Sequence, residues 1–187
     1  MKKIEGKIIK DILIDNDNYH FLRFVFDNDE YLTFMASGDC CSESWFADII
    51  GIHDVINSKI YKVESIQLME ISLYAGFFSP TKKETEDLKE NQEKLKSEIK
   101  QHFSISESKL DEIVSYPRHK SEYDILYGIK VYSDIGVMTV IFRNSSNGYY
   151  GGWLDEIPME EKNQKNWANV YPAVKFVSIA KNDEWRA

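Results

Sequence analysis

Three short apolar runs separated by two dense turn signals occupy the first 35 residues of the sequence. Residues 8–14 are apolar and β-branched, residues 19–26 contain three phenylalanines, and residues 31–35 repeat the apolar pattern. Residues 15–18 and 27–30 consist of Asp, Asn and Glu, and clusters of Asp and Asn are typical of tight turns. Strands joined by such short connections pair in an antiparallel way. The sequence therefore predicts a three-stranded antiparallel meander.

A change of period after this meander predicts a helix over residues 42–50. Ser42 is a favourable N-cap, and the negative charge of Glu43 suits the first turn of a helix. Gly51 is a typical residue at a helix C-terminus. Four apolar side chains fall on one face at helical spacing: Trp45, Phe46, Ile49 and Ile50.

The rest of the chain alternates between β-rich runs and one helical segment. Residues 59–74 have apolar side chains at both parities, which predicts a strand that is central in its sheet or strongly twisted. Residues 123–133 and 137–142 predict a second hairpin, and a β pattern returns at residues 173–179. The tail beyond residue 182 is expected to fray.

Residues 79–117 differ from the rest in composition and predict an inserted helical hairpin. Pro80 follows Ser79, which suits a helix start, and a charge-rich segment with a narrow apolar stripe comes next. Residues 104–107 fit a capping box that opens a second helix, and Pro117 ends it. We expect the stripe to dock on the parent sheet rather than on another protein.

Together these patterns predict an α+β fold in a single domain of residues 1–187. An antiparallel sheet forms the core, one helix packs on it after the first polar motif, and the helical hairpin is an insertion. The formal net charge of −8 argues against direct binding to nucleic acid, because such proteins usually present a basic surface. An acidic surface could instead dock on a basic groove of a protein partner.

The same composition bears on the compartment. No stretch approaches the roughly 18 apolar residues of a membrane span, so we expect no membrane association. The chain has two cysteines, which are adjacent and cannot link distant segments. Nothing in this usage indicates an oxidising compartment, and we expect a cytoplasmic protein.

Two polar motifs follow the two predicted hairpins. The first spans residues 38–45 and reads G-D-C-C-S-E-S-W, and the second spans residues 143–153 and reads R-N-S-S-N-G-Y-Y-G-G-W. Each comes after a strand that ends in phenylalanine, Phe34 or Phe142, so we expect both motifs on one rim of the sheet.

Cysteine chemistry is one interpretation of the first motif. Cys40 and Cys41 would open the predicted helix, whose N-terminus stabilises a thiolate, and His53 could act as a base. We favour the alternative in which one cysteine is buried packing and the other lines the turn. A metal site built from Asp39, both cysteines and a histidine (His20, His53, His102 or His119) is disfavoured, because adjacent cysteines do not have the spacing of zinc ligands. We expect no metal and no cofactor.

A polar ligand site is the other interpretation, and it draws on both motifs. Arg143 supplies a forked cation, the Asn and Ser side chains supply donors and acceptors, and the glycines allow close backbone approach. A rigid connection in which these groups bond their own backbone is almost equally favoured, with a slight preference for the ligand role. The predicted ligand- or partner-binding residues are Asp39, Cys40, Cys41, Ser42, Trp45, Arg143, Asn144, Ser145, Ser146, Asn147, Tyr149 and Tyr150.

At these motifs the chain resembles a family of uncharacterised domains found in bacteria and bacteriophages. Its members carry a G-D-C-C-S-x-S-W segment and an R-N-S-S-N-G-Y-Y-G-G segment, which stand here at residues 38–45 and 143–152. The likeness covers roughly residues 6–75 and 123–155. The resemblance implies a phage or prophage setting and a shared site, and no assigned reaction.

The leading functional hypothesis is a non-catalytic binding protein of phage type. Its target would be a host protein or a small polar ligand, and it could disable a host defence factor through its acidic surface or its motif rim. The alternative is a hydrolase or transferase that acts on a phosphate- or sugar-bearing ligand at this rim. Whether the protein is an enzyme is left open by the sequence.

Overall fold

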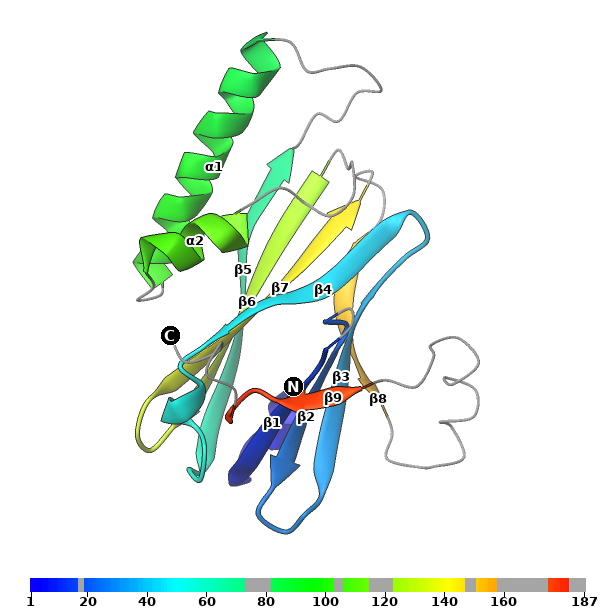
Figure 1. The fold of residues 1–187 in the computed structure, drawn as a ribbon, viewed down its shortest axis with the longest axis vertical. Coiled ribbons are helices and arrows are strands. Elements are labelled where there is room, and N and C mark those ends of the chain that lie inside the picture. Colours follow the sequence, from blue (N-terminus) through cyan, green and yellow to red (C-terminus); the bar gives the residue numbers. More distant parts are fainter. Residues whose placement is uncertain are drawn as a thin grey trace.

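Two antiparallel sheets face each other across a shared apolar core and make up most of the structure (Figure 1). This computed structural model describes residues 1–16, 19–72, 82–102, 106–114, 123–146, 151–157 and 175–181. Over these residues the chain is mainly β, with a minor helical part between the fifth and sixth strands. No helix in the described part of the chain is long and apolar enough to cross a membrane.

The first sheet contains the predicted meander, which is confirmed. Strands β1 (Ile9–Asp15), β2 (Phe21–Phe26) and β3 (Tyr31–Gly38) pair in sequence and antiparallel. Strand β8 (Gly152–Ile157) joins the free edge of β3, and β9 (Phe176–Ser178) joins that of β1. The order is β8-β3-β2-β1-β9, so segments distant in sequence close both edges of the meander.

The second sheet contains the predicted hairpin, which is also confirmed. Strands β6 (Tyr123–Ser133) and β7 (Val137–Ser146) pair antiparallel, with β4 (Ser42–Ile50) on one side and β5 (Ile60–Ser72) on the other. The order is β4-β7-β6-β5. β5 is therefore an edge strand of the described sheet rather than a central one. Helix α1 (Lys82–His102) contacts β5. A helix that covers an edge strand can bury apolar side chains of that strand, which accounts for apolar residues at both parities.

The predicted helix over residues 42–50 is wrong, because this segment is strand β4. The register between β4 and β7 shifts between Phe46 and Asp48, which marks a β-bulge. Across this bulge Phe46 and Ile49 both enter the core, although they are three residues apart. The bulge thus reproduces helical spacing in a strand, and the aromatic and β-branched composition of the segment favours the strand.

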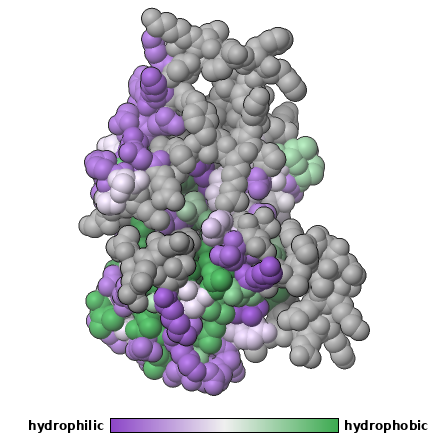
Figure 2. Space-filling view, viewed as in Figure 1, coloured by the Kyte–Doolittle hydropathy of each residue, from purple (hydrophilic) through white to green (hydrophobic). Residues whose placement is uncertain are grey.

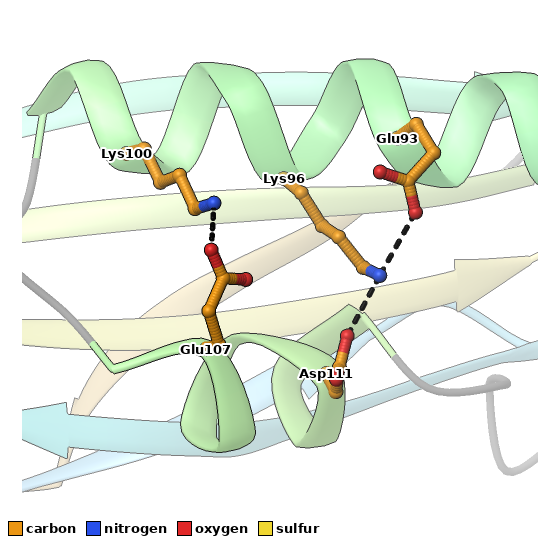
Figure 3. A network of polar contacts seen from close by, with 5 residues as sticks. All are labelled: Glu93, Lys96, Lys100, Glu107 and Asp111. Atoms are coloured by element: carbon orange, nitrogen blue, oxygen red, sulfur yellow. Dashed lines mark hydrogen bonds and ion pairs between the residues drawn. The ribbon is translucent and has the colours of Figure 1, made fainter.

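Helices α1 and α2 (Glu107–Val114) occupy the described part of residues 79–117, beside the edge of the second sheet (Figure 1). Lys96 pairs with Glu93 at 2.9 Å and with Asp111 of α2 at 2.7 Å, and Lys100 pairs with Glu107 (Figure 3). The hydrogen bond to Asp111 is the largest cause that raises the pKa of Lys96. Hydrophilic residues dominate the described surface of α1 (Figure 2). The helical part is small, so the predicted α+β class is corrected to mainly β.

The core between the two sheets is built from alternate residues of both. Each fully buried large apolar side chain contributes on the order of 1.5–3 kcal/mol. The first sheet supplies Ile12, Ile14, Leu22, Phe24, Phe26, Phe34 and Ala36, and the second supplies Phe46, Ile49, Ile60, Val63, Ile129, Val131, Met138, Val140 and Phe142. Toward the turn between β3 and β4, this apolar layer ends at Phe46 and Phe142, which pair across β4 and β7.

Candidate functional site

The two polar motifs meet at one corner of the sandwich, where two segments pass from one sheet to the other (Figure 1). β3 of the first sheet leads through residues 39–41 into β4 of the second, and β7 of the second sheet precedes β8 of the first. β3 pairs with β8 as far as Gly38 opposite Gly152. β4 pairs with β7 from Ser42 opposite Ser146 onward. The expected common rim is therefore present.

Asn144 and Ser44 form the interior of this corner. Both are buried, and they lie opposite each other in β7 and β4, directly beyond the Phe46–Phe142 pair. Asn144 Nδ2 donates a hydrogen bond to Ser44 Oγ at 2.8 Å. It also lies 3.4 Å from the carbonyl oxygen of Glu43. This polar pair forms the last layer of the core.

Two glycines let the first sheet approach this polar pair. A Cβ atom on Gly152 would lie 2.5 Å from Ser44 Oγ and 2.6 Å from Asn144 Cβ, closer than side-chain carbons are ever found. A Cβ atom on Gly38 would lie 3.2 Å from Asn144 Nδ2. We refer to Gly38, Ser44, Asn144 and Gly152 as the corner lock, because they hold both sheets together where the chain crosses between them.

One polar atom of the corner lock has no partner. Asn144 Oδ1 is buried and accepts no hydrogen bond from any residue within the described ranges. A buried acceptor left unpaired costs about 1–3 kcal/mol, so such an atom needs an explanation beyond stability. The polar residues at this corner are thus less stabilising than apolar residues of the same shape would be.

The turn between β3 and β4 places both cysteines on the surface. Ser42 donates from its backbone nitrogen and from Oγ to the carbonyl oxygen of Asp39, at 3.1 and 2.9 Å. Cys41 takes the left-handed conformation with φ of 65°, and both thiols are exposed. No helix N-terminus lies here, so the predicted thiolate environment is wrong. The favoured alternative is half right, because the cysteines line the turn but neither is buried.

The neighbouring thiol of Cys40 raises the pKa of Cys41, first through charge repulsion and then through a hydrogen bond between the two side chains. A raised pKa lowers the fraction of thiolate at neutral pH, and the thiolate is the nucleophilic form. His53 lies in a short 3-10 turn, Ile52–Asp54, after β4 and is exposed. The described residues therefore give these thiols no activating helix.

The polar start of the second motif lies inside β7 rather than in a loop. Arg143, Ser145 and Ser146 are all buried, and the guanidinium of Arg143 lies 5.7 Å from the ring centroid of Trp45, its cross-strand partner. This position favours a structural role for Arg143, against the ligand role expected from the sequence. Asn147, Tyr149 and Tyr150 lie outside the described residues.

The tryptophan that ends the second motif is exposed at the same corner. Trp153 is 41% exposed, and its Nε1 donates to Asp155 Oδ2 at 3.0 Å. It lies opposite Ser37, on the face of the first sheet that points away from the core. We refer to Asp39, Cys40, Cys41, Gly151 and Trp153 as the rim, since all five are exposed at this corner. The sequence singles out Trp153 as part of the motif, and the strand register places it on the outer face of the sheet.

The described residues do not form a metal site. No three His, Cys, Asp or Glu side chains gather there closely enough to hold a metal ion. His20 lies 3.9 Å from a Glu43 carboxylate oxygen, and both side chains are partly buried. His102 ends α1, and His119 lies outside the described residues.

The corner lock predicts different responses from two adjacent glycines. Gly152→Ala should lower the free energy of unfolding by about 1–3 kcal/mol, because the new methyl group overpacks Ser44 and Asn144. Gly151→Ala is the matched control, since nothing lies within 4 Å of a Cβ atom there, and it should stay within about 0.5 kcal/mol. Urea denaturation measures both. Equal midpoints for the two variants would contradict this packing.

The turn geometry predicts slow alkylation of the cysteines at low pH. Iodoacetamide reacts with the thiolate, and the raised pKa of Cys41 moves its reaction to higher pH. Labelling of Cys41 in the native protein, followed with mass spectrometry, should be slow near pH 6 and rise only above about pH 8. Cys40→Ser should shift the profile of Cys41 toward lower pH, because the neighbouring thiol is gone. Fast labelling near pH 6 would show an activated thiol.

Comparison with known proteins relates the chain to a viral sequence of unknown function. The chain is 29% identical over 143 residues to Uncharacterized protein L278 of Acanthamoeba polyphaga mimivirus, which covers 75% of this chain and 79% of that protein. No protein-family model matches the chain, and no solved structure matches it. The resemblance to a bacterial and bacteriophage domain family therefore stays a prediction that rests on the two motifs, while a distant similarity to an uncharacterised viral protein is observed.

Proposed function

We propose that this chain is a non-catalytic binding protein of viral or prophage type that recognises its target with the rim. The observation that carries the proposal is the exposed Trp153 beside the exposed turn of residues 39–41, at the place where the two motifs converge. Tryptophan is enriched among the residues that dominate binding energy at protein interfaces. A large exposed aromatic residue next to the corner lock is typical of a recognition surface.

The corner lock supports this proposal by making the rim rigid. β3 and β8 pair up to Gly38 and Gly152, and the backbone nitrogen of Asp39 lies 3.4 Å from the carbonyl oxygen of Gly151. A surface that is ordered before binding loses less conformational entropy when the complex forms. The unpaired acceptor of Asn144 fits the same view, since a polar layer that fixes the corner geometry serves recognition more than stability.

The charge of the chain supports a basic protein as the target. The formal net charge is −8, the carboxylate of Asp155 accepts a hydrogen bond from Trp153, and Asp39 is exposed in the turn after β3. Acidic surfaces speed association with basic partners through long-range attraction. The similarity to a mimivirus protein supports a viral setting. We therefore propose a host protein as the target, a host defence factor as its class, and the host cytoplasm as the place of binding.

The alternative of a hydrolase or transferase for phosphate- or sugar-bearing ligands has less support. Such an enzyme would use a rim residue as nucleophile, and the pKa of Cys41 is shifted in the unfavourable direction. Arg143, the cation expected to hold a phosphate, lies buried against Trp45. No observation in the described residues favours this second function over binding.

Capture from host lysate with a matched pair of variants tests the proposed function. A rim variant, Asp39→Lys with Trp153→Ala, removes the exposed ring and reverses one charge. The control, Ile135→Ala, changes a residue that is 65% exposed in the turn between β6 and β7, at the other end of β7. The wild type and the control should enrich the same host protein, and the rim variant should lose it, as measured by quantitative mass spectrometry. Equal enrichment by all three would contradict recognition at the rim.

A further inference from the structure

The outer face of the first sheet carries a row of side chains that ends at the rim. Phe34 and Ala36 of β3 enter the core, so Ser37 points to the opposite face, and Trp153 lies directly across from it on β8. Asp155 is two residues along β8 and shares that face. Asp39 follows Ser37 by two residues and is exposed.

On the same face, one arginine of this chain already lies between aromatic rings and a hydroxyl group, an arrangement that we call the Arg23 slot. Arg23 of β2 lies opposite Thr33 of β3, and its Nε donates to Thr33 Oγ1 at 2.8 Å. The guanidinium carbon lies 4.3 Å from the Tyr31 ring centroid and 4.1 Å from the Phe176 ring centroid. Burial lowers the pKa of Arg23, yet the aromatic rings and the hydroxyl oxygen satisfy the cation.

The rim repeats the elements of this slot without a cation of its own. Trp153 supplies the ring and Ser37 supplies the hydroxyl, four residues and about 13 Å along β3 from Thr33. Ser37 Oγ is buried and has no hydrogen-bond partner among the residues that the structure describes, so the groups that a partner can reach are the Trp153 ring and the Asp155 carboxylate. Within the same ranges no Lys or Arg lies over the Trp153 ring. The carboxylate of Asp155 adds a negative charge at the ring.

We infer that the partner presents an arginine side chain to the rim, with its guanidinium stacked on Trp153. The inference rests on the proposed function and deepens it by naming the group that is recognised. The planar guanidinium can lie on the indole ring and still donate in the same plane to the carboxylate of Asp155, which a lysine ammonium cannot do. The hydrogen bond from Trp153 Nε1 to Asp155 fixes the orientation of the ring before the arginine arrives. The partner is thus a protein with an exposed basic segment.

Titration of the full chain with short peptides tests the inference. The probe is a blocked Gly-Arg-Gly-Arg-Gly peptide, and its counterpart carries citrulline, which has the shape of arginine without the charge. In a 15N-labelled sample the indole Nε1–H signal of Trp153, assigned with Trp153→Phe, should shift and saturate with the arginine peptide and stay in place with the citrulline peptide. Trp153→Ala should weaken binding by about fivefold or more, since a stacked cation on a tryptophan is worth that much.

Two further variants separate the site from general attraction to an acidic protein. Asp155→Asn should weaken binding about twofold to fivefold, as expected for loss of one exposed ion pair. Tyr61→Ala should leave binding unchanged, because Tyr61 is 60% exposed on β5 of the other sheet. Equal affinity of wild type and Trp153→Ala, or equal affinity for both peptides, would overturn the inference. If host capture depends on the rim while the arginine peptide does not bind, the arginine inference fails and the proposed function stands. If host capture ignores the rim, the proposed function fails.

Discussion

The hydrogen bond between Asn144 and Ser44 is the interaction on which the rest of the structure depends. It joins β7 to β4 at the point where the chain crosses between sheets, and it sits against two glycines that belong to the other sheet. Strands that change sheets at a bend are the usual way to build the corner of a β-sandwich. Here the bend needs Gly38 and Gly152 to be free of side chains, because the space of a methyl group is already filled. This packing accounts for the glycines and small polar residues of both motifs.

The corner also shows a balance between stability and geometry. An apolar residue at Asn144 would continue the layer of Phe46 and Phe142, whereas the amide leaves a buried acceptor unpaired in the described structure. Buried polar groups fix one arrangement of neighbouring strands more firmly than apolar groups, which can repack. The exposed residues of the rim stand on this fixed base. A fixed corner that holds the exposed side chains of the rim in place suits recognition of a specific partner.

Much of the strand layout could be predicted from the sequence, because turn residues mark strand ends directly. The clusters at residues 15–18 and 27–30 delimit the meander, and Asp134 to Gly136 delimit the second hairpin. The segment of residues 42–50 could not be predicted, since a bulge at Phe46 places apolar side chains at helical spacing. That the bulge exists depends on pairing with β7, which lies about a hundred residues away in the chain.

The candidate site shows the same limit. The sequence predicted that the two motifs meet, because each follows a hairpin. It did not predict which of their side chains are exposed. Polar residues such as Asn144 and Ser145 are typical of loops, yet here they continue β7 into a buried corner. In the sequence Trp153 suits a ligand site and a core position almost equally, and only the register of β8 against β3 places it outside. Pairing partners thus decide which residues of a polar motif are available to a ligand.

Nuclear Overhauser contacts measured in a labelled sample of the full chain test the central claim most directly. The account predicts cross-strand contacts between Gly38 and Gly152 and between Trp45 and Arg143, because each pair lies opposite in an antiparallel ladder. It also predicts the strong sequential Hα-to-amide contacts of a strand over residues 42–50. Sequential amide-to-amide contacts of a helix over those residues, or the absence of any contact between the two motifs, would contradict a shared corner.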